Sequence, residues 1–412
     1  MAADLLIILG GIIALGFIGN LFFERTRIPD IILLISTGFI LGPLTRIVPV
    51  ETVRPFMPAF GAMALTIILF EGGLDLNLQK TLAQAWKALI LAFLSFAVSM
   101  FVIYYALTIG LNISGRYGWA LSAALACTSA PIVIPLIARL VPTSPMRPML
   151  AVESALSDAL SVIVVLTLIE LKGLPLSGSA LLHSLSRSLF IGGVVASLAG
   201  LLWLWALSRL YSQKYYYLLT LGFVFLMMGA VEHVHGSGAV AVLTFGIVLA
   251  NGQTLMSVLG LSWRERLSKL FRNGQIELHP RITESHSEIS FLVRTFFFIY
   301  LGVIFRWPGN DFRLWLTILL VSIAIVISRE VSVQLLGWIA RISARNRTLL
   351  TAMLPRGLAT AVLTAILVLD RAQLGGPPEA LATFTIVITN IWTTLRMLKF
   401  RKFALQADEE VT

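Results

Sequence analysis

Long apolar runs recur from one end of this sequence to the other, separated by short polar connections. A run of about 18 residues or more makes a helix long enough to cross the roughly 30 Å hydrocarbon core of a bilayer. Charged residues make up only 13% of the chain, whereas they make up about a quarter of a typical soluble domain. We therefore expect an all-α polytopic membrane protein, because a helix satisfies its own backbone polar groups inside lipid.

The apolar runs divide into thirteen segments that can each be a transmembrane span. The first lacks the basic region and the cleavage site of a signal peptide, so we expect it to be retained as a span. The predicted spans cover residues 4–23, 28–48, 56–76, 84–110, 117–140, 146–171, 181–208, 215–233, 236–252, 288–306, 312–338, 347–369 and 379–397.

Basic residues are distributed unevenly among the connections between these spans. One set of alternate connections holds twenty Lys and Arg residues, and the other holds seven. Because cytoplasmic loops carry the excess of positive charge, we expect a plasma (inner) membrane protein with its N-terminus outside and its C-terminus in the cytoplasm. The net charge of +10 is then a topology signal with added attraction to membrane lipid, and no nucleic-acid partner is expected.

No polar stretch is long enough to predict a separate soluble domain. We expect one transmembrane domain over 1–412, with a first inverted repeat at 1–171, a linking helix at 172–214, a second inverted repeat at 215–398 and a short cytoplasmic tail at 399–412. In this arrangement the fifth and twelfth spans occupy equivalent positions in the two repeats.

Ionisable residues within the predicted spans are few, and such residues are costly in lipid and commonly functional. The clearest are Glu71, Glu153, Asp158, Arg329 and Arg356. Two of them belong to the segment ESALSDAL. A helical wheel places both of its carboxylates, and also Ser154 and Ser157, on one face of the sixth span.

Asp158 lies about ten residues into this span, which puts it roughly 15 Å deep and close to the bilayer midplane. A carboxylate flanked by hydroxyl groups binds either a proton or a hard cation, and a site that alternates between the two is an exchanger. Glu153 is better explained as half of an interhelical ion pair with Arg329. No further buried basic residue is evident to neutralise Asp158, which favours a role in transport.

Proline breaks two predicted spans at matching positions in the two halves. Pro131 and Pro135 lie in ACTSAPIVIPLIARL of the fifth span, and Pro355 and Gly357 lie in MLPRGLATAVL of the twelfth. Proline has no N–H, so a carbonyl four residues earlier loses its helical partner. Paired broken helices of this kind are typical of the midplane site of a secondary transporter.

These motifs resemble the monovalent cation–proton antiporter superfamily, and in particular its branch of electroneutral sodium/proton exchangers. That branch has Glu-Ser-x-x-Asn-Asp in the sixth of thirteen spans, where this chain has Glu153, Ser154, Ser157 and Asp158. ILFEGGLDLNL is similar to the third span of the family, GSGAVAVLTFGIVLAN to the ninth, FFFIYLGVIF to the tenth and LPRGLATAVL to the twelfth. The likeness covers nearly the whole chain and keeps the order of the motifs.

The resemblance implies that a monovalent cation, Na⁺ or K⁺, binds at Asp158 and exchanges there for a proton. Oxygen ligands or polar support are expected from Ser154, Ser157, Thr128, Ser129 and Glu71. Glu153 and Arg329 are expected to form a structural ion pair. Arg356 is expected to neutralise freed carbonyls or helix ends where the fifth and twelfth spans cross.

By the same resemblance we expect a transporter and not an enzyme. This transporter is expected to work by alternating access, to need no cofactor, to form a homodimer and to serve pH homeostasis. A single titratable carrier predicts electroneutral 1:1 exchange. Two residues depart from the family: Ser157 replaces its Asn, and Ala130 replaces its Asp before Pro131. The less negative site favours a larger, less strongly hydrated cation, so potassium/proton exchange stays open beside sodium/proton exchange.

A second function stays open on the sequence alone. Sodium-coupled symporters of organic solutes share crossed, broken helices, so the architecture does not separate them from exchangers. Such a carrier needs more polar or aromatic groups around a wider cavity, and few are present beyond those named. A membrane sensor that transports nothing would leave Asp158 and both proline breaks without a purpose.

Overall fold

Every regular element in the described part of the chain is a helix. The computed structural model describes residues 2–26, 29–76, 78–141, 144–171, 178–210, 215–234, 236–252, 254–255, 280–370 and 378–409. Parts of the predicted linking helix and tail, namely 172–177, 211–214 and 410–412, lie outside the described residues.

The helices group into two units that alternate along the chain. Unit 1 consists of Met1–Gly61, Lys87–Leu168 and Phe291–Thr412, and unit 2 of Ala62–Trp86 and Ile169–Ser290. Among the described helices four contribute residues to both units, and these are α4 (Met57–Asp75), α5 (Leu78–Leu111), α8 (Arg147–Glu170) and α14 (Pro280–Val303).

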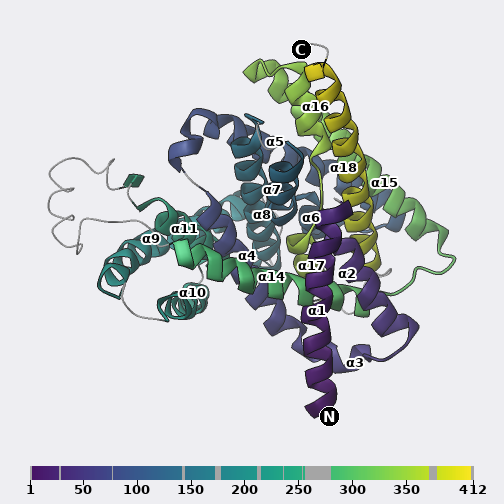
Figure 1. Ribbon diagram of the computed structural model, residues 1–412, viewed down its shortest axis with the longest axis horizontal. Coiled ribbons are helices and arrows are strands. Elements are labelled where there is room, and N and C mark those ends of the chain that lie inside the picture. The colour runs from purple at the N-terminus through teal and green to yellow at the C-terminus, as the bar shows by residue number, and fades with distance from the viewer. Residues whose placement is uncertain are drawn as a thin grey trace. The chain divides into compact units, whose positions relative to one another are not determined.

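Unit 1 holds the two spans for which the sequence predicts breaks. Besides its parts of α4, α5 and α14, unit 1 contains α1 (Ala2–Thr26), α2 (Asp30–Phe39), η1 (Ile40–Leu44), α3 (Val50–Val53), η2 (Arg54–Phe56), α6 (Gly115–Ala126), α7 (Ala130–Leu140), nearly all of α8, α15 (Phe312–Ala340), α16 (Ala344–Ala352), α17 (Leu358–Asp370) and α18 (Pro378–Glu409). Within this unit α17 packs against α6 and against α18, and α16 packs against α15 and α18 (Figure 1).

Unit 2 is built on a tight group of three helices. These are α9 (Gly178–Leu210), α10 (Tyr216–His233) and α11 (Gly238–Ala250), and α11 packs against both of the others (Figure 1). Phe245 of α11 contacts Phe70 of α4 and Phe223 of α10, with ring centroids 6.0 and 5.5 Å apart. The aromatic cluster therefore ties α4 and α10 to α11.

Each of the thirteen predicted spans coincides with a helix or with two consecutive helices. Within the described residues seven helical segments are long and apolar enough to cross a membrane, with α6 and α7 taken together, and three more are apolar but shorter. The all-α polytopic class is therefore confirmed, whereas the inverted repeats stay a prediction. The last helix runs on past its predicted span to Glu409, so the described part of the predicted tail is helical.

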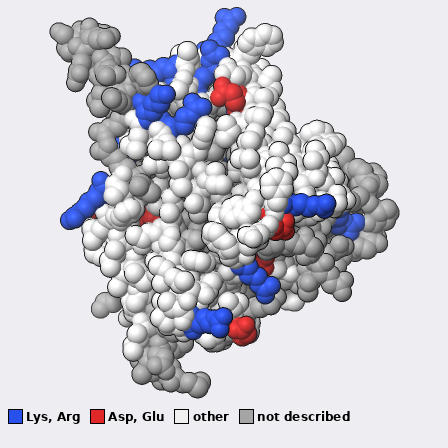
Figure 2. Space-filling model, turned by 90° about the vertical axis from the view of Figure 1, so that its right-hand side faces the viewer, with Lys and Arg blue, Asp and Glu red and all other residues white. Residues whose placement is uncertain are grey.

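Much of the exposed surface is apolar, as is typical of a protein that faces lipid. Most of the face in Figure 2 is uncharged, with Lys and Arg near its upper edge and further charged residues scattered along its sides and lower part. Helix α15 exposes large apolar side chains along its length, among them Phe312, Leu319 and Trp338. Asp311 caps the start of this helix by accepting from the backbone N–H groups of Arg313 and Leu314.

Glycine allows α2 and α14 to approach each other closely within unit 1. A Cβ atom on Gly38 would lie 2.0 Å from the Ile299 carbonyl oxygen, and one on Gly302 would lie 2.2 Å from the Ile35 carbonyl oxygen. Both distances are far shorter than a van der Waals contact. Small residues at facing positions are a common means of packing membrane helices, because the backbones can then touch.

We therefore predict that Gly302→Ala destabilises the protein. The added methyl group meets backbone and not a movable side chain, so the cost is expected at about 1–3 kcal/mol. The measurement is the midpoint of thermal unfolding in detergent.

Gly193→Ala in α9 is the matched control, because nothing lies within 4 Å of the position of its Cβ. Alanine is the better helix former, so this variant should keep or raise the midpoint. Equal midpoints for both variants would contradict the close approach of α2 and α14.

Candidate functional site

Two unwound segments cross inside unit 1. The first, residues 127–129, separates α6 from α7, and the second, residues 353–357, separates α16 from α17. The backbone N–H of Ser129 donates to the carbonyl oxygen of Pro355 at 3.0 Å. A Cβ atom on Gly357 would lie 2.6 Å from the Cβ of Ser129, which no side-chain rotation moves away, so a larger residue would require the crossing to shift.

Asp158 lies at the first break, halfway along α8. Its side chain is 4% exposed, and its Oδ2 accepts from the backbone N–H of Ala130 at 3.2 Å. Ala130 is the first residue of α7, so the carboxylate faces the positive end of a helix dipole. Within the described residues the other carboxylate oxygen, Oδ1, is buried and has no hydrogen-bond partner.

The two serines that follow the same face of α8 bind backbone groups of the same broken span. Ser157 Oγ accepts from the backbone N–H of Thr128 at 3.0 Å, and Ser161 Oγ donates to the carbonyl oxygen of Ala123 at 2.8 Å. Helix ends leave such groups without an intrahelical partner. Helix α8 therefore supplies the partners that the break in its neighbour removes.

Arg356 lies in the second break and reaches the first. Its side chain is 2% exposed, and its Nη1 donates to Thr128 Oγ1 at 3.3 Å. The backbone of the same residue is held by α18, because its N–H donates to Thr389 Oγ1 at 3.1 Å and its carbonyl accepts from Asn390 Nδ2 at 2.8 Å. Cys127 Sγ and Thr360 Oγ1 form a further contact across the breaks at 3.4 Å.

Glu153 and Arg329 form a buried, bidentate ion pair between α8 and α15. Nη1 lies 2.7 Å from Oε1 and Nη2 lies 3.2 Å from Oε2, while the side chains are 0% and 2% exposed. Arg329 also donates to the carbonyl oxygen of Leu350 at 2.9 Å and to Ser95 Oγ at 3.3 Å. The guanidinium thus ties α8, α15, α16 and α5 together around one charge.

The remaining predicted ligands of unit 1 lie near the crossing but differ in what they do. The Ser154 hydroxyl donates to carbonyls of its own helix, those of Leu150 and Ala151 at 2.8 and 3.1 Å. The Thr128 hydroxyl accepts from Arg356. Of the serines on α8, Ser157 is therefore the one whose hydroxyl contacts the backbone of the break at Thr128.

Glu71 belongs to unit 2, where it is part of another polar network. The Ser290 hydroxyl on α14 donates to Glu71 Oε2. One turn earlier on α14, His286 lies between Tyr217 Oη and the Ile67 carbonyl oxygen, at 3.0 and 3.1 Å. Because a carbonyl can only accept, Nε2 of this histidine carries the proton and Nδ1 accepts from the tyrosine.

Several residues at the site are not among the sequence predictions. Thr389 and Asn390 lie in TIVITNIWTT, where a polar pair inside an apolar span was the available signal. Arg294 on α14 donates to the carbonyl oxygen of Pro131 at 3.5 Å and lies 3.9 Å from Asp30. That carbonyl is the one freed by Pro135, which has no N–H four residues later.

A comparison with known families identifies the kind of protein in which these two broken spans cross. Residues 11–400 match the family described as "Sodium/hydrogen exchanger, transmembrane". The chain belongs to this family. The resemblance stated from the span motifs, to the cation–proton antiporters, is thereby confirmed.

Individual relatives of the sodium/hydrogen exchanger family agree with this assignment. The chain is 24% identical over 416 residues to Na(+)/H(+) antiporter 1 of Methanocaldococcus jannaschii, covering 98% of this chain and 92% of the relative. The structure of the sodium proton antiporter MjNhaP1 from that organism at pH 8 matches with a TM-score of 0.77 and 21% identity over 97% of both chains. An electron-microscopy map of MjNhaP1 gives 0.74 and 21% over 96% of this chain and 95% of the other. At these identities the structural matches establish the fold.

We predict that Arg329→Gln strongly lowers stability. The substitution leaves Glu153 as a buried charge without its partner, which typically costs about 3–5 kcal/mol. The midpoint of thermal unfolding in detergent should fall steeply. The double variant Glu153→Gln/Arg329→Gln should recover part of that loss, because no uncompensated charge remains.

Glu330→Gln is the control, since Glu330 adjoins Arg329 in the sequence but is exposed and only accepts from Gln334 on its own helix. Its midpoint should stay close to that of the wild type. A double variant less stable than Arg329→Gln alone would show that the ion pair does not act as a unit.

Proposed function

We propose that this chain is a secondary transporter that exchanges a monovalent cation for a proton at Asp158. One observation carries the proposal: a buried carboxylate lies at the crossing of two broken spans, with one oxygen held by a backbone N–H and the other without a partner in the described residues. The sodium/hydrogen exchanger family and a relative named as a Na(+)/H(+) antiporter support cation/proton exchange.

The chemistry of exchange follows from competition for one carboxylate. A proton and a cation both bind the lone pairs of Asp158 and both neutralise its charge, so the binding of one excludes the other. Ser157 and Thr128, with Ser129 in the same break, are the nearby oxygen-bearing side chains proposed to assist the cation. Ser154 is proposed to support the face of α8, and Glu71 to assist from its network with Ser290.

We propose alternating access as the way in which Asp158 is loaded and unloaded. The carboxylate sits where the backbone is unwound on two spans, and irregular backbone within a membrane is tolerated where it is enclosed by protein or lines a cavity. Arg356 is proposed to keep the two segments together as they move, because its side chain binds one break and its backbone lies in the other.

The proposed stoichiometry is one cation per proton, which makes the exchange electroneutral. Glu153 is proposed to remain in its ion pair with Arg329, so the proposal assigns exchange to Asp158. Asp158 is then the one carboxylate on α8 that alternates between its loaded forms.

The exchanger is favoured over the sodium-coupled symporter by family membership. Ala130 places a methyl group where the family has a second carboxylate, so we propose that K⁺ competes with Na⁺ more effectively than at a site with two acids. The homodimer, the plasma membrane location, the outward N-terminus and a role in pH homeostasis stay predictions.

We predict that Asp158→Asn abolishes cation-dependent proton movement. The amide cannot release a proton and carries no charge to hold a cation. The measurement is dequenching of an internal pH dye in proteoliposomes after Na⁺, K⁺ or Li⁺ is added. Wild-type protein should respond, and the variant should match protein-free liposomes with each ion.

Glu330→Gln serves again as the control, because it removes an exposed carboxylate outside the crossing and should retain full exchange. Full exchange by Asp158→Asn would refute the assignment of the site. If the wild type moves protons with none of the three ions, the exchanger proposal itself fails and organic solutes become the substrates to test.

We further predict that exchange carries no net charge. In proteoliposomes adsorbed to a solid-supported membrane, a rapid Na⁺ jump should produce a pH signal without a steady transport current. With the same K⁺ concentration on both sides of the membrane in every sample, the addition of valinomycin should leave the rate of Na⁺-driven exchange unchanged. A current that disappears in Asp158→Asn would contradict 1:1 stoichiometry and leave cation/proton exchange intact.

A further inference from the structure

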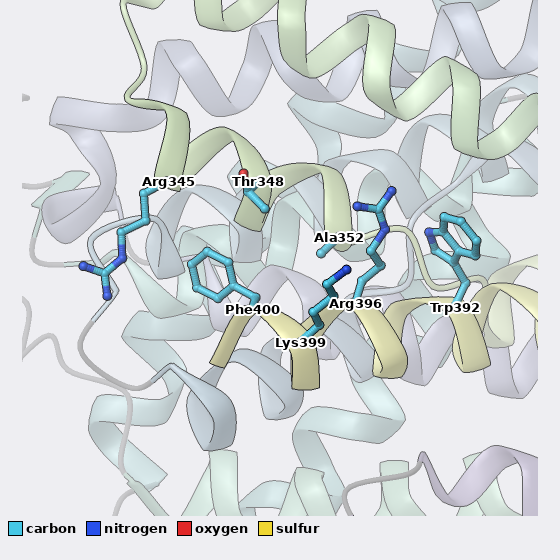
Figure 3. A pocket seen from close by; sticks show the side chains of 7 residues that line it. All are labelled: Arg345, Thr348, Ala352, Trp392, Arg396, Lys399 and Phe400. Carbon is cyan, nitrogen blue, oxygen red and sulfur yellow. The ribbon is translucent and has the colours of Figure 1, made fainter. Parts of the chain in front are cut away.

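A basic pocket lies between α16 and the C-terminal half of α18, within unit 1. Its volume is about 460 Å³. Arg345 and Thr348 line it from α16, and Trp392, Arg396 and Lys399 line it from α18. Figure 3 shows Arg396 and Lys399 extending from α18 toward α16, with Arg345 at the opposite end.

The pocket carries three positive charges and no negative one. No acidic residue is among those that line it, and none of its three cations forms an ion pair within the described residues. The Arg396 guanidinium lies over the Trp392 ring at 5.1 Å from its centroid, a cation–π contact that fixes the position of the charge. Like charges gathered in one pocket repel each other, and a bound anion relieves that repulsion.

The start of α16 adds to the positive potential. The helix begins at Ala344, where the Ser343 hydroxyl accepts from the Asn346 N–H, and Arg345 follows in the first turn. A helix N-terminus carries partial positive charge and favours anions, so an arginine here is unfavourable in the absence of one. The helix dipole and the three side chains therefore select the same kind of ligand.

We propose that this pocket binds a phosphate group, and that its source is the head group of an anionic phospholipid. Arginine pairs with phosphate through two parallel hydrogen bonds, while lysine adds a compact charge. Thr348 lines the pocket from the facing helix, and its hydroxyl donates to the Ala344 carbonyl oxygen at 3.1 Å, so the charged side chains are the proposed phosphate donors. A free phosphate offers the same chemistry, so the test must separate the two sources.

Three features around the pocket favour the lipid as the source. Helix α15 ends at Ala340 and α16 starts at Ala344, so the pocket lies beside the turn between two spans, where head groups are expected. Trp392 combines an apolar ring with a polar edge, as is typical of residues at the membrane interface. Leu395, one position before Arg396, is 62% exposed and offers apolar surface to an acyl chain.

The pocket also adjoins the crossing. Ala352 belongs to its wall and is the residue directly before the second break, while the Leu350 carbonyl two residues earlier accepts from Arg329. A head group that bridges α16 and α18 would stabilise the packing that holds this break. Binding should therefore raise the thermal unfolding midpoint, and the increase should grow with lipid concentration.

The test measures lipid retention by the purified full-length protein. Native mass spectrometry in detergent would count bound phosphatidylglycerol against phosphatidylcholine over a titration, and the unfolding midpoint would be read in parallel. We expect one strongly retained phosphatidylglycerol per chain. Loss of one cation should weaken that affinity about fivefold in Arg396→Gln, and further in Arg396→Gln/Lys399→Gln.

Arg209→Gln is the matched control. The Arg209 guanidinium also lies over a tryptophan one turn earlier, 5.8 Å from the centroid of the Trp205 ring, but Arg209 does not line the pocket. This variant should retain the lipid as the wild type does. A parallel titration with inorganic phosphate distinguishes the two sources. If the wild type binds phosphate but retains no lipid, and Arg396→Gln loses the phosphate binding, the pocket is assigned to free phosphate. Equal lipid retention by wild type and double variant, with no phosphate binding, would overturn the proposal.

Discussion

The need to satisfy backbone groups that two breaks release inside an apolar protein governs the rest of this structure. An unpaired N–H or carbonyl costs several kcal/mol in such surroundings, on the order of a lost hydrogen bond in hydrocarbon. Helix α8 supplies partners to the first break through Ser157, Asp158 and Ser161. Helix α18 supplies them to the second through Thr389 and Asn390. The polar residues of both helices are therefore needed to satisfy the backbone at the crossing, whether or not they also bind a ligand.

Two of the acids on α8, Glu153 and Asp158, have different partners. Both oxygens of Glu153 are bound by Arg329, which fixes the position of this carboxylate. Asp158 has one oxygen bound by a backbone N–H and leaves the other for a ligand. The Arg356 guanidinium acts on Asp158 electrostatically, without the two hydrogen bonds that Arg329 makes to Glu153. This difference in partners, and not in residue type, underlies the proposal that Glu153 is structural and that Asp158 is the exchange site.

The sequence allowed the spans, both breaks and the polar face of α8 to be predicted, because apolar length, proline and helical period are local properties. Partners are not local. Ser154 shares the polar face, yet its hydroxyl donates to a carbonyl of its own helix. A helical wheel does not show whether a hydroxyl binds its own helix or a neighbouring one. Asn390 and Arg294 acquire their roles only once a freed carbonyl lies beside them. Glu71 is an acidic residue within a span, and its carboxylate belongs to a polar network in unit 2. Its partner Ser290 is distant in sequence, so this role also depends on the tertiary structure.

The departures from the family at two positions differ in their physical consequence. At position 130 the carboxylate is lost, but the contact with Asp158 comes from the backbone N–H, which any residue except proline provides. Ala130 therefore lowers the negative charge of the site and preserves its geometry. Ser157 keeps an acceptor for the Thr128 N–H but is shorter than asparagine and lacks its amide donors. A site with one acid and shorter polar neighbours attracts a cation less strongly and compensates its dehydration less fully. The cost of dehydration is lower for K⁺ than for Na⁺, and this difference is the physical basis of the proposal that the two substitutions reduce the advantage of the smaller ion.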